Sequence, residues 1–258
     1  MAQRNLGIFL EGRFQSGPNE YEVRSPYDGA VVSVISRGGP AEVDRAIADA
    51  VRVAPTMAAL PAFRRAEILE RMRALMVENF DDVVAAIREE SGKPLRFARI
   101  EVERALDTFS DSATVARHEA SDLLNLDAYA PGEGRMGLIR RVPVGPVSAI
   151  SPFNFPLNLV AHKVAPGIAA GCPVVLKPAS QTPSAALLLG RFAAEAGLPE
   201  GGLAVVPCSR DGAAGFTDDD RLKLLTFTGS PEVGWKLKAR AGRKKVVLEL
   251  GGNAAAVV

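Results

Sequence analysis

The feature that most constrains the fold is a strand-helix-strand pattern within residues 147–183. An apolar run at 147–150 stops at a Ser-Pro pair, an apolar helix-like segment follows at 157–170, and a second apolar run at 174–176 leads into Lys177. Such a unit joins two parallel strands by a right-handed crossover. The carboxyl ends of both strands are therefore expected at the same edge of a sheet.

Polar side chains follow both of these strands. Asn154 lies just after the first strand, and Lys177 ends the second. In open α/β sheets, ligands bind in the crevice outside the carboxyl ends of the strands, so we expect Asn154 and Lys177 to face the same crevice. The alternative is that Asn154 caps the helix and Lys177 is an exposed strand-end charge, and this unit alone does not decide between the two.

The chain beyond Pro146 alternates regularly between strand and helix, which predicts an α/β fold with a doubly wound parallel sheet of five strands. The strands are expected at residues 147–150, 174–176, 203–206, 222–227 and 246–250. The helices between them are expected at residues 157–170 and 184–196, near Ala213, and at 231–241. We expect a Rossmann-like variant. The G-x-G-x-x-G fingerprint is absent from the first strand turn, so the ordinary Rossmann signature does not support a dinucleotide here.

Residues 1–121 predict a small antiparallel layer followed by helices. Short strands are expected at residues 8–10, around Phe14, at 21–24 and at 31–36. Helices are expected from residue 40 to near Pro55, where the proline should end the first one, and then at 61–79, 81–90 and from 94 to about 118. We expect this region to pack on the sheet of residues 145–258.

Residues 122–144 predict a protruding β-hairpin around a glycine-rich turn. An isolated hairpin with so much exposed edge is marginally stable in water. We therefore expect it to pair with another chain, or with a part of the protein that this sequence does not contain. The chain is thus divided into residues 1–121, the hairpin, and the sheet domain at 145–258.

Charge and cysteine content exclude several classes of partner. The 258 residues include 31 Lys and Arg against 30 Asp and Glu, a formal net charge of +1, so no strong overall field attracts nucleic acid or an anionic membrane. The two cysteines have neither metal-ligand nor disulfide-framework spacing. No signal peptide and no run of about 20 apolar residues is present. We expect a cytoplasmic protein that binds no metal, nucleic acid or membrane.

The segment Thr228-Gly229-Ser230 places a glycine and two hydroxyls at the start of a helix whose first residue is Pro231. Free backbone N–H groups and the positive end of the helix dipole make such a position suitable for a diphosphate. The alternative is that Ser230 is an ordinary N-cap residue.

Glu249 follows three apolar residues at 246–248 and precedes Leu250, Gly251 and Gly252. The pattern places a carboxylate at the edge of the sheet, where a raised pKa would let it activate water. Pairing of Glu249 with a nearby lysine is an equally valid interpretation of this residue taken singly.

Four segments in this order and spacing resemble the aldehyde dehydrogenase superfamily over essentially the whole chain. They are S-P-F-N-F-P-L-N at 151–158, V-V-L-K-P-A-S-Q-T-P at 174–183, L-T-F-T-G-S-P-E-V-G at 225–234 and L-E-L-G-G-N-A at 248–254. The resemblance implies oxidation of an aldehyde to a carboxylic acid with NAD or NADP. In that chemistry a cysteine thiolate attacks the aldehyde, and water hydrolyses the resulting thioester.

The resemblance also implies roles for individual residues. Asn154 would stabilise the developing oxyanion, and Glu249 would activate the hydrolytic water. The residues implied in cofactor binding are Ile150, Ser151, Pro152, Phe153, Lys177, Ser180, Arg210, Thr228, Gly229, Ser230, Val233, Leu250 and Gly251. Many NAD-using members carry a glutamate where this chain has Ser180, so we expect NADP to be accepted, with Lys177 and Arg210 near its extra phosphate.

One departure from the family pattern concerns the nucleophile. The family's cysteine follows E-L-G-G by a few dozen residues, whereas this sequence ends at Val258, and we interpret Cys172 and Cys208 as buried structural thiols. The chain is therefore expected to be the cofactor-binding portion of such an enzyme, truncated before the catalytic cysteine and inactive alone. The alternative is a non-catalytic nucleotide-binding or assembly module, which would need neither Asn154 nor Glu249. The resemblance further implies a small polar aldehyde as substrate and a homodimer or homotetramer of the complete protein.

Overall fold

The central sheet contains the five expected parallel strands. The structure is a computed structural model that describes residues 3–119 and 121–255. The parallel strands are β8 (Val147–Ile150), β9 (Val174–Lys177), β10 (Leu203–Val205), β11 (Leu224–Gly229) and β12 (Lys245–Leu250), and they lie in the order β12-β11-β8-β9-β10. The chain runs from β8 through β9 to β10 on one side of β8, and then continues with β11 and β12 on the other side. The sheet is therefore doubly wound, as predicted.

The N-terminal strands divide between two sheets, which corrects the expectation of one separate antiparallel layer. β2 (Ile8–Leu10) and β3 (Arg13–Gln15) extend the central sheet to seven strands, with β2 antiparallel to β10. β1 (Arg4–Leu6), β4 (Asn19–Arg24) and β5 (Val31–Arg37) form a second sheet in which β1 runs parallel to β5. All three residues of β2 are buried, as expected of a strand covered on both faces.

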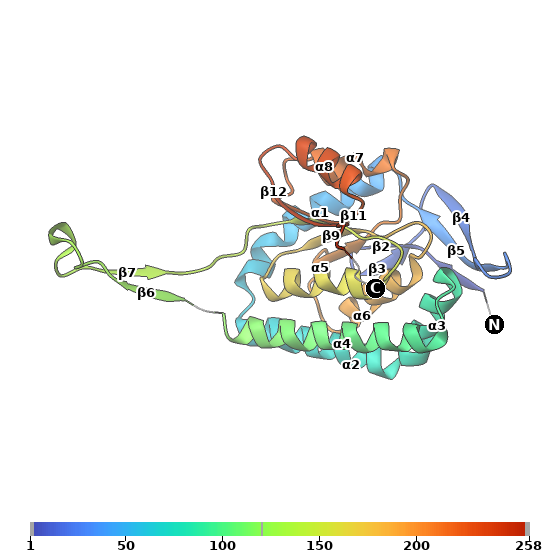
Figure 1. The fold of residues 1–258 in the computed structure, drawn as a ribbon, viewed down its shortest axis with the longest axis horizontal. Coiled ribbons are helices and arrows are strands. Elements are labelled where there is room, and N and C mark those ends of the chain that lie inside the picture. The colour runs from blue at the N-terminus through green and yellow to red at the C-terminus, as the bar shows by residue number, and fades with distance from the viewer. Residues whose placement is uncertain (1–2, 120, 256–258) are drawn as a thin grey trace.

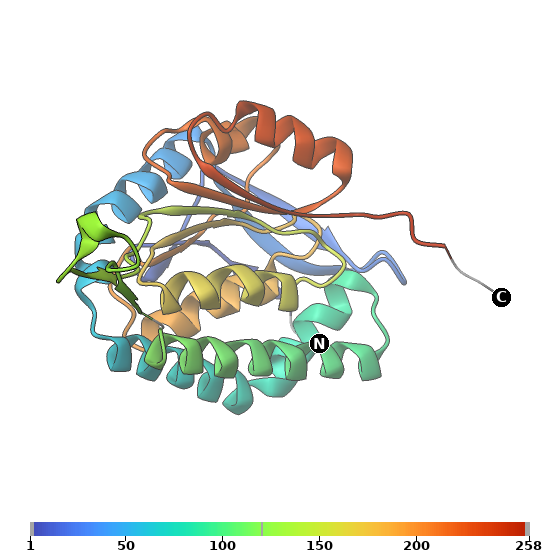
Figure 2. The ribbon, with the colours of Figure 1, turned by 60° about the vertical axis from the view of Figure 1, so that its left-hand side comes forward.

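Helices cover both faces of the central sheet (Figures 1 and 2). One face carries α5 (Asn158–Ala169) and α6 (Ser184–Glu195), and the other carries α1 (Pro40–Ala59), α8 (Pro231–Arg240) and α7 (Ala214–Asp218), which follows the short 3₁₀ helix η2 (Asp211–Ala213). A further layer of α2 (Ala62–Glu78), α3 (Phe80–Ser91) and α4 (Leu95–Arg117) packs outside α5 and α6. These helices place one apolar stripe each against the layer below, as their 3.6-residue periodicity requires.

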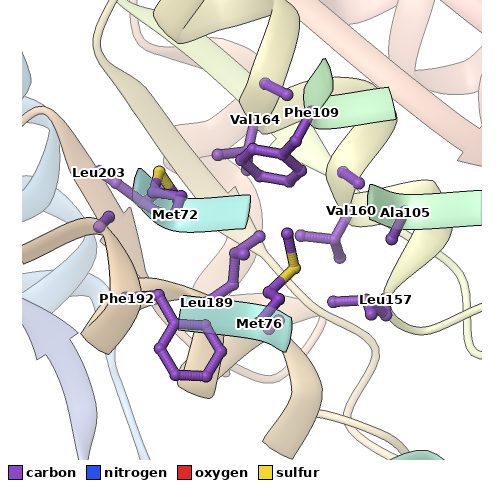
Figure 3. Close-up of a cluster of buried hydrophobic side chains, with 14 of the residues drawn as sticks. Met72, Met76, Ala105, Phe109, Leu157, Val160, Val164, Leu189, Phe192 and Leu203 are labelled. Carbon is purple, nitrogen blue, oxygen red and sulfur yellow. The ribbon is translucent and has the colours of Figure 1, made fainter. Parts of the chain in front are cut away.

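Figure 3 shows how the outer helices share one core with α5 and α6. Met72 and Met76 from α2 and Phe109 from α4 point toward Val160 and Val164 of α5, and none of these side chains is accessible to solvent. Burying a side chain of this size contributes roughly 1.5–3 kcal/mol. The region 1–121 is thus joined to the sheet domain by a continuous apolar core.

Helix α1 does not end at Pro55, contrary to the sequence-based expectation. It continues to Ala59 with Pro55 in its interior, and Met57 beyond the proline is fully buried. Tertiary packing of the last turn outweighs the hydrogen bond that the proline removes. Among the described residues no single helix is long and apolar enough to span a membrane; α1 and α2 reach that length and hydropathy only as a pair, and they meet at a bend of 117°.

The predicted hairpin is present and projects away from the rest of the molecule (Figure 1). It consists of β6 (Asp122–Asn125) and β7 (Met136–Ile139), joined by a loop that contains the 3₁₀ helix η1 (Ala130–Gly132). Apolar side chains are exposed along it, namely those of Leu123, Leu124, Leu126, Tyr129, Met136, Leu138, Ile139 and Val142. An exposed apolar set of this kind is typical of a surface that another polypeptide covers.

Candidate functional site

The register of the parallel strands brings most of the predicted site residues to one edge of the sheet. Ile150 pairs with Lys177 on one side and with Phe227 on the other, and Thr228 pairs with Glu249 one residue further along. All four strands end there, so the expected convergence of their carboxyl ends is present. Sequence motifs up to 100 residues apart therefore meet at one rim.

The side chains at this rim divide between the two faces of the sheet. Thr228 contacts Lys163 of α5, and Thr228 pairs with Glu249, so both lie on the α5 face. Val175 belongs to the core cluster of α1, and side chains two residues apart on a strand share a face, so Lys177 lies on the α1 face. The site thus has two sides, one next to α5 and the other next to α1 and α7.

On the α5 side, four side chains form a connected hydrogen-bond network. The Lys163 Nζ donates to the hydroxyls of Thr226 at 3.1 Å and Thr228 at 2.7 Å, and the Thr228 hydroxyl donates to Glu249 Oε2 at 2.6 Å. Lys163 is only 4% exposed. Burial lowers the pKa of Lys163 to about 8, and the negative charge of Glu249 partly opposes that shift.

Lys163 is a site residue that the sequence analysis missed. Its signal is a lysine in the middle of the apolar segment L-V-A-H-K-V-A-P, where a helix buried on both sides leaves no room for a solvated charge. A lysine in such a position needs polar partners. The hydroxyls of Thr226 and Thr228 supply them.

Glu249 lines a groove of about 720 Å³ between α4, α5 and the base of the hairpin. The wall of the groove includes Asp111 and His118 from α4, His162 from α5 and Arg141 from the segment after β7. The carboxylate of Glu249 is exposed to solvent. A groove of this size and polarity can hold a small organic molecule beside a carboxylate.

Asn154 lies in the irregular segment between β8 and α5, and it is exposed. Lys93, from the turn between α3 and α4, donates through Nζ to the Asn154 carbonyl at 2.8 Å. The buried carboxylate of Glu101 on α4 accepts from the backbone N–H groups of Leu157 and Asn158, at 2.9 and 3.2 Å. The Asn154 turn is therefore held from the α4 side of the rim, which is also the side of Glu249.

On the α1 side, Lys177 lies near Cys208 and Arg210. Burial lowers the pKa of Lys177, the Cys208 thiol opposes that shift, and the charge of Arg210 adds to it. Ser180 is half-buried and Arg210 is exposed. The Ser230 hydroxyl accepts a hydrogen bond from Val233 N at 3.4 Å. Ser230 is therefore the N-cap of α8, which was the alternative interpretation of this residue.

Both cysteines are buried. Burial raises the pKa of the Cys208 thiol to about 11. A thiol with that pKa is almost wholly protonated at neutral pH and is a poor nucleophile. The interpretation of the two residues as structural thiols agrees with this environment.

A comparison with models of protein families identifies the family of the chain. The model of the aldehyde dehydrogenase family matches residues 14–258. The chain belongs to the aldehyde dehydrogenase family. The resemblance drawn from the four sequence motifs is thereby confirmed.

Curated relatives in the aldehyde dehydrogenase family include enzymes of known substrate. The chain is 36% identical to 3-sulfolactaldehyde dehydrogenase of Priestia megaterium, over 99% of this chain and 53% of that protein. It is 39% identical to glutarate-semialdehyde dehydrogenase of Pseudomonas aeruginosa, over 97% of this chain and 52% of that protein. The chain thus spans about half the length of the curated relatives that it matches.

Solved structures of aldehyde dehydrogenases have the same fold. Aldehyde dehydrogenase 21 of Physcomitrella patens, in complex with the product succinate, superposes with a TM-score of 0.96 at 45% identity, over 98% of this chain and 53% of that one. The NADP-dependent glyceraldehyde-3-phosphate dehydrogenase of Bacillus halodurans, complexed with NADP, gives a TM-score of 0.93 at 30% identity, over 97% of this chain and 53% of that one.

Proposed function

We propose that this chain is the cofactor-binding part of an NADP- or NAD-dependent aldehyde dehydrogenase that oxidises an aldehyde to a carboxylic acid. The observation that carries the proposal is the position of Glu249, hydrogen-bonded to Thr228 at the rim and facing a groove on the same side as the Asn154 turn. In this proposal the Asn154 side-chain amide donates a hydrogen bond to the developing oxyanion. Glu249 takes a proton from the water that attacks the acyl intermediate.

The α1 side of the rim suits a dinucleotide with an additional phosphate. Lys177 and Arg210 bring positive charge next to Ser180, whose small side chain leaves space for a phosphate. The turn at Gly229 and Ser230 opens α8, whose dipole is positive at that end. The nicotinamide would accept a hydride from the substrate, while this chain's residues bind and orient the cofactor at the rim.

The aldehyde that we propose carries an anionic group. Curated relatives are named for 3-sulfolactaldehyde, sulfoacetaldehyde and the semialdehydes of aspartate, glutarate and succinate, and each of these compounds bears a carboxylate or a sulfonate. Arg104, exposed on α4, lies with its guanidinium carbon 5.9 Å from the ring centre of Phe155, the residue after Asn154. A guanidinium in this position would pair with the far end of such a substrate.

The test compares an anionic aldehyde with a neutral one on the full-length gene product. For unaltered protein we expect kcat/KM to be higher for succinate semialdehyde than for butanal. Arg104→Met should lower kcat/KM for succinate semialdehyde roughly 10- to 100-fold, because a charge-assisted hydrogen bond contributes about 1.5–3 kcal/mol, and leave butanal within about twofold.

Two outcomes would count against the proposal. Equal losses for both aldehydes in Arg104→Met would reject the anionic substrate, and no aldehyde-dependent reduction of NAD or NADP by the full-length product would reject the dehydrogenase itself. Residues 1–258 alone should be inactive, since both of their cysteines are buried.

A further inference from the structure

The segment that carries Asn154 has no regular secondary structure of its own to fix it. Asn154 and its neighbours Phe153 and Phe155 are exposed, between the end of β8 at Ile150 and the start of α5 at Asn158. A side chain that stabilises a transition state must be held within about 0.5 Å of its productive position. The restraint on Asn154 therefore has to come from other parts of the chain.

Glu101 supplies part of that restraint. Its side chain is buried in α4, and one carboxylate oxygen, Oε1, accepts hydrogen bonds from both Leu157 N and Asn158 N. These N–H groups lie at the start of α5, where the helix itself offers them no carbonyl partner and where a negative charge complements the helix dipole. The second oxygen, Oε2, pairs with Lys93.

Lys93 supplies the remainder. Besides its ion pair with Glu101, its Nζ donates to the carbonyl oxygen of Asn154 at 2.8 Å and lies 4.0 Å from the ring centre of Phe155. The Lys93 side chain is only 14% exposed and that of Glu101 is 0% exposed, so the ion pair between them is shielded from solvent. One ammonium thus contacts Asn154, the residue after it, and the carboxylate that holds the start of α5.

We propose that Lys93 and Glu101 form a clamp that positions Asn154 for aldehyde oxidation, an inference that rests on the function proposed above. Lys93 fixes the backbone at Asn154, and Glu101 fixes the chain three and four residues later. Together they restrain the peptide on both sides of Phe155, and through it the direction of the Asn154 amide. Both are positioning residues, because they act through Asn154.

If Lys93 had a purely structural role, its replacement would affect stability without a specific effect on the Asn154 turn. Arg4 offers the matched control. Arg4 pairs with Glu89 of α3, and its side chain is 15% exposed, close to the 14% of Lys93. Within the described residues, the ion pairs of Arg4 are with Glu89 and Asp82, not with residues 151–158. Replacing either cation should lower the free energy of unfolding by a similar amount, whereas only replacement of Lys93 should affect the Asn154 turn.

The kinetic experiment uses the full-length gene product. Lys93→Met should lower kcat roughly 10- to 100-fold while KM for the aldehyde and the Kd for NADP stay within about twofold, and Lys93→Arg should restore part of the loss. Arg4→Met should leave kcat within about twofold at a similar fall in Tm. In a double-mutant cycle, Lys93→Met should have little further effect on kcat once Asn154→Ala is present. An unchanged kcat in Lys93→Met, or full additivity with Asn154→Ala, would overturn the clamp.

A second measurement tests the clamp if no aldehyde is oxidised, which would be a failure of the proposed function alone. Hydrogen exchange of the peptide that contains Leu157 and Asn158 should be at least fivefold faster in Lys93→Met than in unaltered protein, and unchanged in Arg4→Met. Equal exchange in all three proteins would show that Lys93 does not restrain this segment.

Discussion

A lysine ammonium buried beside two threonines shows how individual residues tune this rim. Lys163 on α5 donates hydrogen bonds to the Thr226 and Thr228 hydroxyls, and the Thr228 hydroxyl in turn donates one to Glu249. A buried ammonium favours its neutral form, so the pKa of Lys163 is lowered to about 8. Lys163 can therefore change its charge near physiological pH, two contacts away from the proposed general base.

Replacement of Lys163 by methionine should alter how stability depends on pH. Because the folded-state pKa of about 8 lies below the unfolded value of 10.5, the unfolded chain binds more protons between these two values. The cost of burying the charge is fully present below pH 8 and is lost as the pH rises toward 10.5. Relative to Lys163→Met, unaltered protein should gain about 2 kcal/mol of stability between pH 7 and pH 10.

Urea unfolding of both proteins across this pH range would measure the difference. At each pH, the unfolding free energy of the variant is subtracted from that of the unaltered protein. This difference removes the contribution of every other titrating group. A difference in unfolding free energy that stays constant from pH 7 to pH 10 would contradict a lowered pKa for Lys163.

At the α1 side, the identity of residue 180 should set the cofactor preference. Ser180→Glu places a carboxylate where we propose that the 2′-phosphate of NADP binds near Lys177 and Arg210. Calorimetric titration should find that Ser180→Glu weakens NADP binding at least tenfold and leaves NAD within about threefold, because the new charge repels only the phosphate. NAD binding tenfold or more tighter than NADP in the unaltered protein would reject the proposed preference.

At the scale of elements, α5 connects the Asn154 turn, after which it begins, with the hydrogen-bonded chain of Lys163, Thr228 and Glu249. It packs closely on β9 at Gly167, where an added Cβ would lie 2.6 Å from Cγ2 of Val174. Valine has a stiff χ1 angle and cannot easily move away. The close approach of α5 to the sheet is thus set by the lack of a side chain at one position.

Gly167→Ala should therefore destabilise the protein, although alanine is the better helix former. Propensity favours alanine by about 1 kcal/mol, whereas overpacking of a tight interface costs about 1–3 kcal/mol. We expect a net loss of about 1 kcal/mol in chemical denaturation. Ser110→Ala, on the exposed surface of α4, is the control and should change stability by less than about 0.5 kcal/mol. A Gly167→Ala protein more stable than the parent would mean that α5 can shift.

At the scale of the whole molecule, the protruding hairpin is the feature that the rest of this chain does not cover. Within residues 3–119 and 121–255 its strands are paired only with each other, and Leu123, Met136 and Leu138 are 66%, 73% and 72% exposed. A two-stranded ribbon with such apolar surface is marginal alone. We propose that it packs on another copy in a homodimer or homotetramer of the complete protein.

Polar substitution in the hairpin should change assembly without changing cofactor binding. In light scattering, the full-length product should be a dimer or tetramer, and Leu123→Ser combined with Leu138→Ser should shift it toward smaller species. The NADP dissociation constant should stay within about twofold, because the rim lies on the sheet domain. A monodisperse monomer of the unaltered full-length protein would contradict this role of the hairpin.

Local sequence signals identified the elements whose hydrophobic pattern agrees with their final packing. The five parallel strands, the helices between them and the hairpin were predicted because apolar runs, prolines and glycines mark each of them. The placement of β2 and β3 was not predicted, because pairing of β2 with β10 joins residues almost 200 positions apart. The passage of α1 through Pro55 was not predicted either, because burial of Met57 is a tertiary effect.

The sequence by itself determined the family, the parallel sheet and the candidate residues Asn154, Lys177 and Glu249, because strand ends and short motifs are encoded locally. Only the tertiary structure decided how these residues are supported. Lys163 reaches Thr228 across 65 positions, and Lys93 reaches Asn154 across 61. A buried charge shows no partner in the linear sequence, because its partner is chosen by the packing of helices on the sheet.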